Sequence, residues 1–221
     1  MRAPWLAAAA AAFAVAGYGQ SPAAVDPVIQ VDYANPGLSP AQWTITLHRD
    51  GAGHFRSQVG KLSSDRPQGI DTPAVDRDFQ VSAGFAARIF DAAARHNRFH
   101  QECESHLKVA FQGWKTFTYT GPEGQGTCTF NYSKDKEIEE LGQSMEGVAE
   151  TILEGARLEI LLEHDRLGLD AEMEFLTDAA ADGRAQQIEA IRDILERLAQ
   201  DDEVLERVRR RAKSLLEHAA T

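Results

Sequence analysis

The chain has 221 residues, of which 43% are hydrophobic and 26% are charged, as in ordinary globular proteins. Its 34 acidic and 23 basic residues give a net charge of −11. An acidic surface repels phosphate backbones and anionic headgroups, which argues against binding to nucleic acids and to anionic membranes. The length is enough for one large domain or two small ones.

Residues 1–19 predict a secretory signal peptide. Arg2 gives a positive start, the run Trp5–Ala16 is apolar, and small residues follow at Gly17 and Gly19. The apolar run is shorter than the about 20 residues that span a bilayer, so we expect no membrane span in the mature chain. The leader predicts a periplasmic or secreted protein, in a compartment where thiols oxidise and nucleotide cofactors are scarce. We therefore expect no cofactor.

The next predicted elements lie between residue 20 and about residue 96. Residues 20–40 are rich in Pro, Ala and Asp and predict an extended lead-in. Apolar and polar side chains alternate over Gln42–Val59, with glycines at the centre, which predicts a β-hairpin. The polar loop Gly60–Pro73 is long enough to be functional. A helix is expected after Ser82, extending to about His96.

Three histidines and a cysteine follow at helical spacing: His96, His100, Cys103 and His106. Imidazole and thiolate are zinc ligands, and offsets of three and four residues share a helix face, so the pattern allows a metal site. Helix propensity fails at Asn97–Phe99, however, and a disulfide at Cys103 would consume the thiolate. We favour an exposed histidine-rich turn and keep a metal site at His96, His100 and His106 as the alternative.

Three further strands are expected at Leu107–Phe111, Trp114–Thr120 and Thr127–Tyr132, because apolar and polar residues alternate in each. Most of their aromatic residues face the core by this alternation. If Tyr119 and Tyr132 point outward, they form an aromatic platform for a ligand or a carbohydrate.

The chain has two cysteines, Cys103 and Cys128. An even, small number in an oxidising compartment predicts one disulfide. The bridge would tie the segment after the first helix to a strand of the sheet.

A long helix is expected from Lys134 to about His164, because apolar residues recur every three to four positions. Ser133 is its expected N-cap. Residues 134–163 include nine acidic and three basic residues, so we expect a negatively charged outer face. The apolar spacing fits a coiled coil for only about two heptads. We therefore interpret this helix as packed on the sheet rather than as a dimer zipper.

Residues 169–221 predict a helical bundle, because short connections separate three apolar stripes. The basic cluster of the chain includes Arg209, Arg210 and Arg211, near the end of the last helix. Positive charge is stabilised there by the helix dipole. The alternative is a docking patch for an acidic partner, and the acidic long helix of this chain is one candidate for that partner.

Together these elements predict an α+β protein. A mostly antiparallel sheet of about five strands packs on two helices over residues 41–168, and the bundle follows at 169–221. The sequence carries no signal that specifies an oligomeric state.

No nucleophile–base pair and no complete set of metal ligands stands out, which favours a secreted or periplasmic non-catalytic binding or structural module with a protein partner in the cell envelope. Its expected working surfaces are the acidic face of the long helix and the loop Gly60–Pro73. The alternative is a metal-dependent or hydrolytic envelope enzyme built on His96, His100 and His106.

Overall fold

The computed structural model describes residues 26–60 and 72–219, which form an α+β fold, as predicted. The leader and residues 61–71 of the expected functional loop lie outside this part of the chain. The strands are β1 (Val28–Ala34), β2 (Gln42–His48), β3 (Ala52–Ser57), β4 (Val75–Gln80), β5 (Trp114–Gly121) and β6 (Gly124–Phe130). The α-helices are α1 (Ala83–Arg95), α2 (Lys136–His164), α3 (Leu169–Ala181), α4 (Arg192–Gln200) and α5 (Glu206–Ala219), with short 3-10 helices η1 (Asn97–Phe99) and η2 (Ile188–Ile191).

The six strands form one antiparallel sheet in the order β4-β3-β2-β1-β5-β6. The expected hairpin is confirmed as β2 and β3. Strand β1 lies at the centre of the sheet, inside residues 20–40, where the sequence predicted only an extended lead-in. Its Ile29, Val31 and Tyr33 alternate with polar residues and are buried, which is the period of a strand with one face in the core.

The prediction of a strand at Leu107–Phe111 is wrong. These residues have no regular structure, and the side chains of Leu107, Val109 and Phe111 are exposed. Alternation favoured a strand, but the backbone of this segment bonds to side chains and loops rather than to a neighbouring strand. The resulting apolar surface is the candidate site described below.

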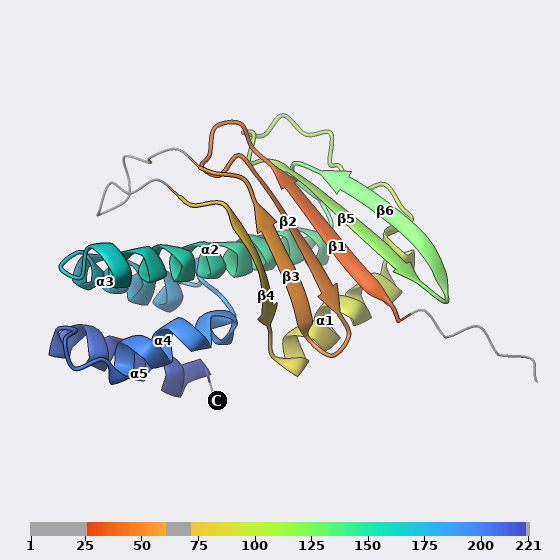
Figure 1. The fold of residues 1–221 in the computed structure, drawn as a ribbon. Coiled ribbons are helices and arrows are strands. Elements are labelled where there is room, and N and C mark those ends of the chain that lie inside the picture. Colours follow the sequence, from red (N-terminus) through yellow and green to blue (C-terminus); the bar gives the residue numbers. More distant parts are fainter. Residues whose placement is uncertain (1–25, 61–71, 220–221) are drawn as a thin grey trace, which may run out of the picture.

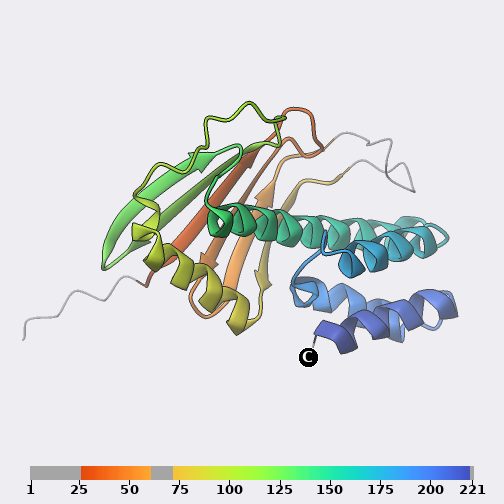
Figure 2. The same cartoon turned by 180° about the vertical axis from the view of Figure 1, so that it is seen from behind.

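Helices cover one face of the sheet. Figure 2 shows α1 and α2 crossing this face, while Figure 1 shows the opposite face with no helix in front of it. Ser82 caps α1 by accepting a hydrogen bond from the backbone N–H of Phe85, as expected. The core between helices and sheet includes Phe55, Phe90 and Phe117.

The open face of the sheet is polar, and its side chains form rows across the strands. One row pairs His54 with Asp78 and continues through Thr46, Gln30 and Thr118. This division into an apolar and a polar face is usual for an antiparallel sheet with one side in water.

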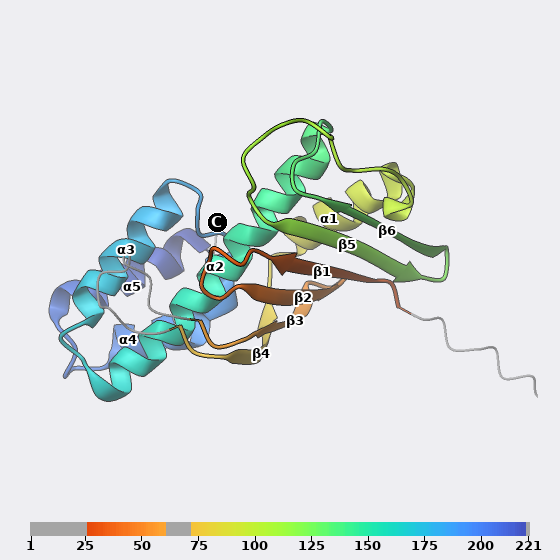
Figure 3. The same cartoon turned by 90° about the horizontal axis from the view of Figure 1, so that it is seen from above.

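Helix α2 joins two hydrophobic cores. Its first part packs on the sheet, and from Leu158 onward its apolar residues belong to a second core with α3, α4 and α5. Figure 3 shows α2 passing under the sheet and continuing beyond it into the bundle. Because α2 is covered on two sides, the expected acidic outer face is largely absent, and even Glu139 and Glu154 are buried. Its N-cap is Asp135 rather than Ser133.

The C-terminal bundle contains α3, α4 and α5 and is close to the expectation for residues 169–221. The middle helix differs, because it begins as η2 and becomes α-helical only at Arg192. None of the helices in the two described stretches is long and apolar enough to cross a bilayer.

Candidate interaction surface

Exposed apolar side chains gather at one end of the sheet. Of the eight large hydrophobic residues that are exposed in the described chain, six lie at this end, and each is between 40% and 70% exposed. We call this surface the apolar sheet end; its residues are Leu38, Val59, Leu107, Val109, Phe111 and Trp114. The other two, Leu167 and Leu205, lie near the helical bundle.

Three segments bring these residues together. The β1–β2 loop, residues 35–41, and the segment leading into β5 lie at the same end of the sheet, at the top of Figure 1. Their closeness follows from the register, because the last residue of β1, Ala34, pairs with Trp114. Val59 follows the end of β3, whose Ser57 pairs with the start of β2.

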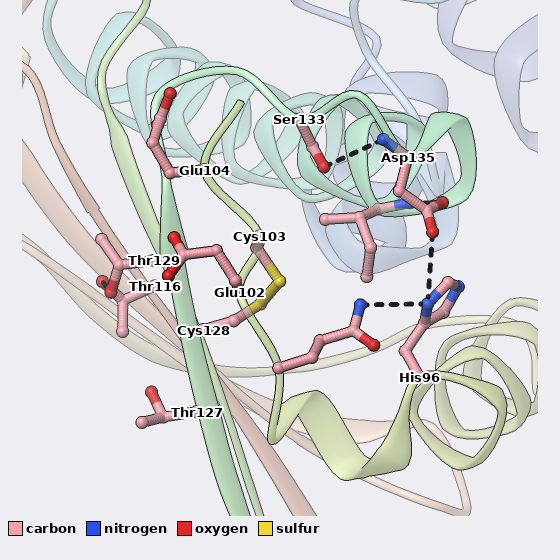
Figure 4. The surroundings of a disulfide bond; sticks show 12 residues. His96, Glu102, Cys103, Glu104, Thr116, Thr127, Cys128, Thr129, Ser133 and Asp135 are labelled. Carbon is pink, nitrogen blue, oxygen red and sulfur yellow. Dashed lines mark hydrogen bonds and ion pairs between the residues drawn. A yellow bond between two sulfur atoms is a disulfide. The ribbon is translucent and has the colours of Figure 1, made fainter. Parts of the chain in front are cut away.

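A disulfide anchors one end of the exposed segment. Cys103 and Cys128 form the predicted bond, which ties the chain before residue 105 to β6. Figure 4 shows the bond on the side of β6 that faces away from Thr127 and Thr129. Both cysteines are buried, so the bridge fixes the segment from beneath the sheet.

Glu104 and Asn131 hold the middle of the segment. The Glu104 carboxylate accepts hydrogen bonds from the backbone N–H groups of Asn131, at 2.6 Å, and His106, at 3.1 Å. Burial acts to raise the pKa of Glu104, but these hydrogen bonds and that of the Ser105 hydroxyl outweigh burial and lower it. The Asn131 side chain accepts from the Gln112 N–H at 2.6 Å and donates to the carbonyl of Ala110.

Tyr33 holds the last residues before β5. Its hydroxyl donates to the carbonyl of Gln112 at 2.8 Å, and its ring stacks on Trp43 at 5.0 Å. Burial raises the pKa of Tyr33, so the hydroxyl keeps the proton that it donates. Gly113 lies directly against this ring with a positive φ of 109°.

At the start of β5, neighbouring side chains point to opposite faces of the sheet. Trp114 points to the open face and makes an edge contact with Phe111, with ring centroids 6.0 Å apart. Lys115 points to the helices and is fully buried, with its ammonium 3.2 Å from a carboxylate oxygen of Glu146. The geometry is that of an ion pair without a directed hydrogen bond, and the same ammonium lies over the ring of Phe130.

The sequence allowed an aromatic platform only if Tyr119 and Tyr132 point outward. Tyr119 is buried on the covered face of the sheet, and its hydroxyl donates to the carboxylate of Glu123. Tyr132 lies after the end of β6 and is partly buried. The exposed aromatic residue of β5 is Trp114.

The three histidines do not meet at a common centre. His96 is bonded to Glu137 at 2.8 Å and to Gln101 at 3.2 Å, while His100 and His106 are exposed. A left-handed turn at Asn97–Phe99 separates them, as the helix propensity indicated. In the described part of the chain no group of three or more histidine, cysteine or acidic side chains could hold a metal ion.

The basic cluster is used within the molecule. Arg209 pairs with Asp202 at 2.6 Å, Arg211 pairs with Asp170 at 2.7 Å, and Arg210 is exposed. Asp170 is in the first turn of α3, so the acidic group that meets this cluster belongs to the bundle rather than to the long helix.

Leu38, Val59 and Trp114 were not predicted from the sequence as surface residues. One signal was present in the sequence: the described residues at this end, 35–41, 58–60 and 107–114, include a single charged residue, Lys108. No protein-family model matches the sequence, and neither does any curated protein.

Proposed function

We propose that the protein is a non-catalytic binding module of the cell envelope, and that it docks through the apolar sheet end. The observation that carries the proposal is the gathering of six of the eight exposed large hydrophobic residues of the described chain at this one place. Exposed apolar side chains gathered in one place mark interaction sites, because exposing them to water is unfavourable.

The support of the exposed segment favours a docking role. Hydrogen bonds to Glu104, Asn131 and Tyr33 fix its backbone, so its apolar side chains project from a defined frame. A pre-organised surface loses less conformational entropy on binding than a flexible one. More of the free energy gained by burying its apolar side chains is therefore available for affinity.

The envelope location rests on two observations. Residues 1–19 have the pattern of an export signal. The disulfide between Cys103 and Cys128 is compatible with an oxidising compartment.

Photocrosslinking in cells tests the proposal. A benzophenone amino acid replaces Val109 in one variant and, in a matched control, Leu167, which is 81% exposed near the bundle. We expect adducts with an envelope protein or lipid to form from position 109 and not from position 167. Equal adduct patterns from the two positions, or none from position 109, would contradict the proposal.

A further inference from the structure

The apolar sheet end is almost free of charge, in contrast to the rest of the molecule. Its three segments, residues 35–41, 58–60 and 107–114, contain only Lys108 among charged residues, whereas 26% of the whole chain is charged. A surface that enters an apolar medium must carry few charged side chains, because each charge is costly to desolvate. A lysine at the rim is tolerated, because its long stem lets the ammonium reach polar groups.

The shape of this surface is that of projecting loops. The β1–β2 loop and the segment before β5 rise beyond the ends of the strands in Figure 1. Two hollows that lie beside β4 in the described part of the chain are lined by other residues. Loops of mixed aliphatic and aromatic residues need no matching groove if they enter a medium that deforms around them.

We propose that the apolar sheet end binds the surface of a zwitterionic lipid bilayer, an inference that rests on the proposed docking function. Trp114 and Phe111 enter the interfacial layer, where aromatic rings are favoured, together with the aliphatic side chains around them. Lys108 reaches the phosphate groups of the lipid headgroups. The protein lies on the bilayer and does not span it.

The charge of the molecule selects the kind of lipid. With a net charge of −11, the body of the protein is repelled by anionic headgroups, and one lysine does not compensate for this repulsion. Zwitterionic headgroups carry no net charge and impose no such cost. Binding is therefore expected to weaken as anionic lipid is added.

Vesicle binding tests the inference with the processed, exported protein, whose N-terminus is checked by mass spectrometry. Sedimentation is measured with vesicles of phosphatidylcholine alone and with phosphatidylcholine mixed with phosphatidylglycerol. Brominated phosphatidylcholine then quenches tryptophans that enter the bilayer. Trp114 is 46% exposed and should be quenched, whereas Trp43 is 6% exposed and serves as the unquenched reference.

The double variant Leu107→Ser, Phe111→Ser should lower the affinity for phosphatidylcholine vesicles by about tenfold or more, since two apolar anchors are removed. Leu167→Ser is the matched control and should bind like the wild type, and near-UV circular dichroism checks that each variant is folded. Wild-type protein that does not bind these vesicles, or a folded double variant that binds equally well, would overturn the inference. Stronger binding to the anionic mixture would do the same.

Other occupants give distinguishable results. If the wild type fails to bind lipid but self-associates in analytical ultracentrifugation, and the double variant is monomeric, the surface binds a second copy of the chain. If lipid binding fails while position 109 still crosslinks to an envelope protein, the lipid inference is wrong and the docking function stands. If both lipid binding and crosslinking fail, the docking function is also wrong.

Discussion

Gly113 is the residue on which the orientation of the exposed segment depends. A β-carbon there would lie 2.5 Å from the Tyr33 hydroxyl, and its φ of 109° is unfavourable for any residue with a side chain. We expect Gly113→Ala to lower the free energy of unfolding by about 2–4 kcal/mol, through backbone strain and displacement of Tyr33. Urea denaturation measures this difference.

Gly124 is the matched control for Gly113. It also has a positive φ, 126°, but an added β-carbon would meet no atom within 4 Å. Gly124→Ala should therefore cost only the backbone strain, about 1–2 kcal/mol. Equal losses for the two variants would show that contact with Tyr33 does not matter.

Lys115 and Glu146 form an asymmetric ion pair. The Lys115 side chain is 1% exposed, but the Glu146 side chain is 35% exposed and reaches water. Burial nevertheless raises the pKa of Glu146, and the nearby Lys115 opposes this with a smaller effect. Removing either partner should thus have unequal consequences.

Glu146→Ala leaves a buried ammonium without its counter-ion and should lower the free energy of unfolding at pH 7 by about 1–3 kcal/mol. Lys115→Met replaces the stem with one of similar volume and leaves a carboxylate that water can solvate, so a loss below about 1 kcal/mol is expected. Thermal or urea unfolding of both variants decides the order. A larger loss for Lys115→Met would contradict this account of the pair.

At the scale of elements, the segment from Glu104 to Gly113 is held mainly by hydrogen bonds to side chains, and not by the backbone hydrogen bonds of a β-ladder. Because the pKa of Glu104 is lower in the folded state than its ordinary value of 4.5, its ionised form stabilises the fold. That contribution is fully present above the unfolded pKa and is lost as the pH falls through the folded pKa. As the pH falls through this lowered pKa, the segment should therefore loosen.

Glu104→Gln should remove this part of the pH dependence, because an amide does not ionise. We expect the protection of the Asn131 and His106 amides in the wild type to decrease as the pH is lowered from 6 through the folded pKa of Glu104, and the variant to show no such decrease. Amide hydrogen exchange monitored by NMR measures both. A variant whose protection falls with pH as steeply as that of the wild type would be inconsistent with a stabilising Glu104 carboxylate.

Much of this architecture was predictable from patterns in the sequence, and the exceptions have physical reasons. The hairpin of β2 and β3, helix α1 and the long α2 follow from periodicity, which reflects burial of one face. Strand β1 was missed because Pro and Ala residues on both sides of it resemble a linker. Leu107–Phe111 has the alternation of a strand, but periodicity does not reveal whether the apolar side faces a core or solvent.

The candidate site was less predictable than the fold. The disulfide was predicted from the cysteine count and the expected compartment. The structure shows the bond. The gathering of Leu38, Val59 and Trp114 depends on strand order, which places β1 between β2 and β5. Local sequence carries little information about which loops meet at one end of a sheet.

At the scale of the whole molecule, α2 makes the sheet and the bundle a single mechanical unit. Arg77 on β4 pairs with Glu159 of α2 at 3.0 Å and with Asp193 of α4 at 2.8 Å. The Thr151 hydroxyl of α2 donates to the carbonyl of Gln186 at 2.7 Å. These contacts tie both cores to one helix, so neither core can lose its packing without exposing a buried side of α2.

Thermal unfolding should accordingly be a single cooperative transition, with the sheet and the bundle melting together. Near-UV circular dichroism follows the aromatic residues, which are concentrated in the sheet region, and far-UV circular dichroism follows the helices; the two midpoints should coincide. Gly155→Val tests the coupling directly, because a β-carbon at this position would lie 2.4 Å from Ile191 and force η2 away from α2. Both midpoints should fall by the same amount in this variant, since the weakened contact joins the two cores. Two separated transitions in the wild type, or a fall confined to the helical signal in the variant, would show that the bundle is an independent domain.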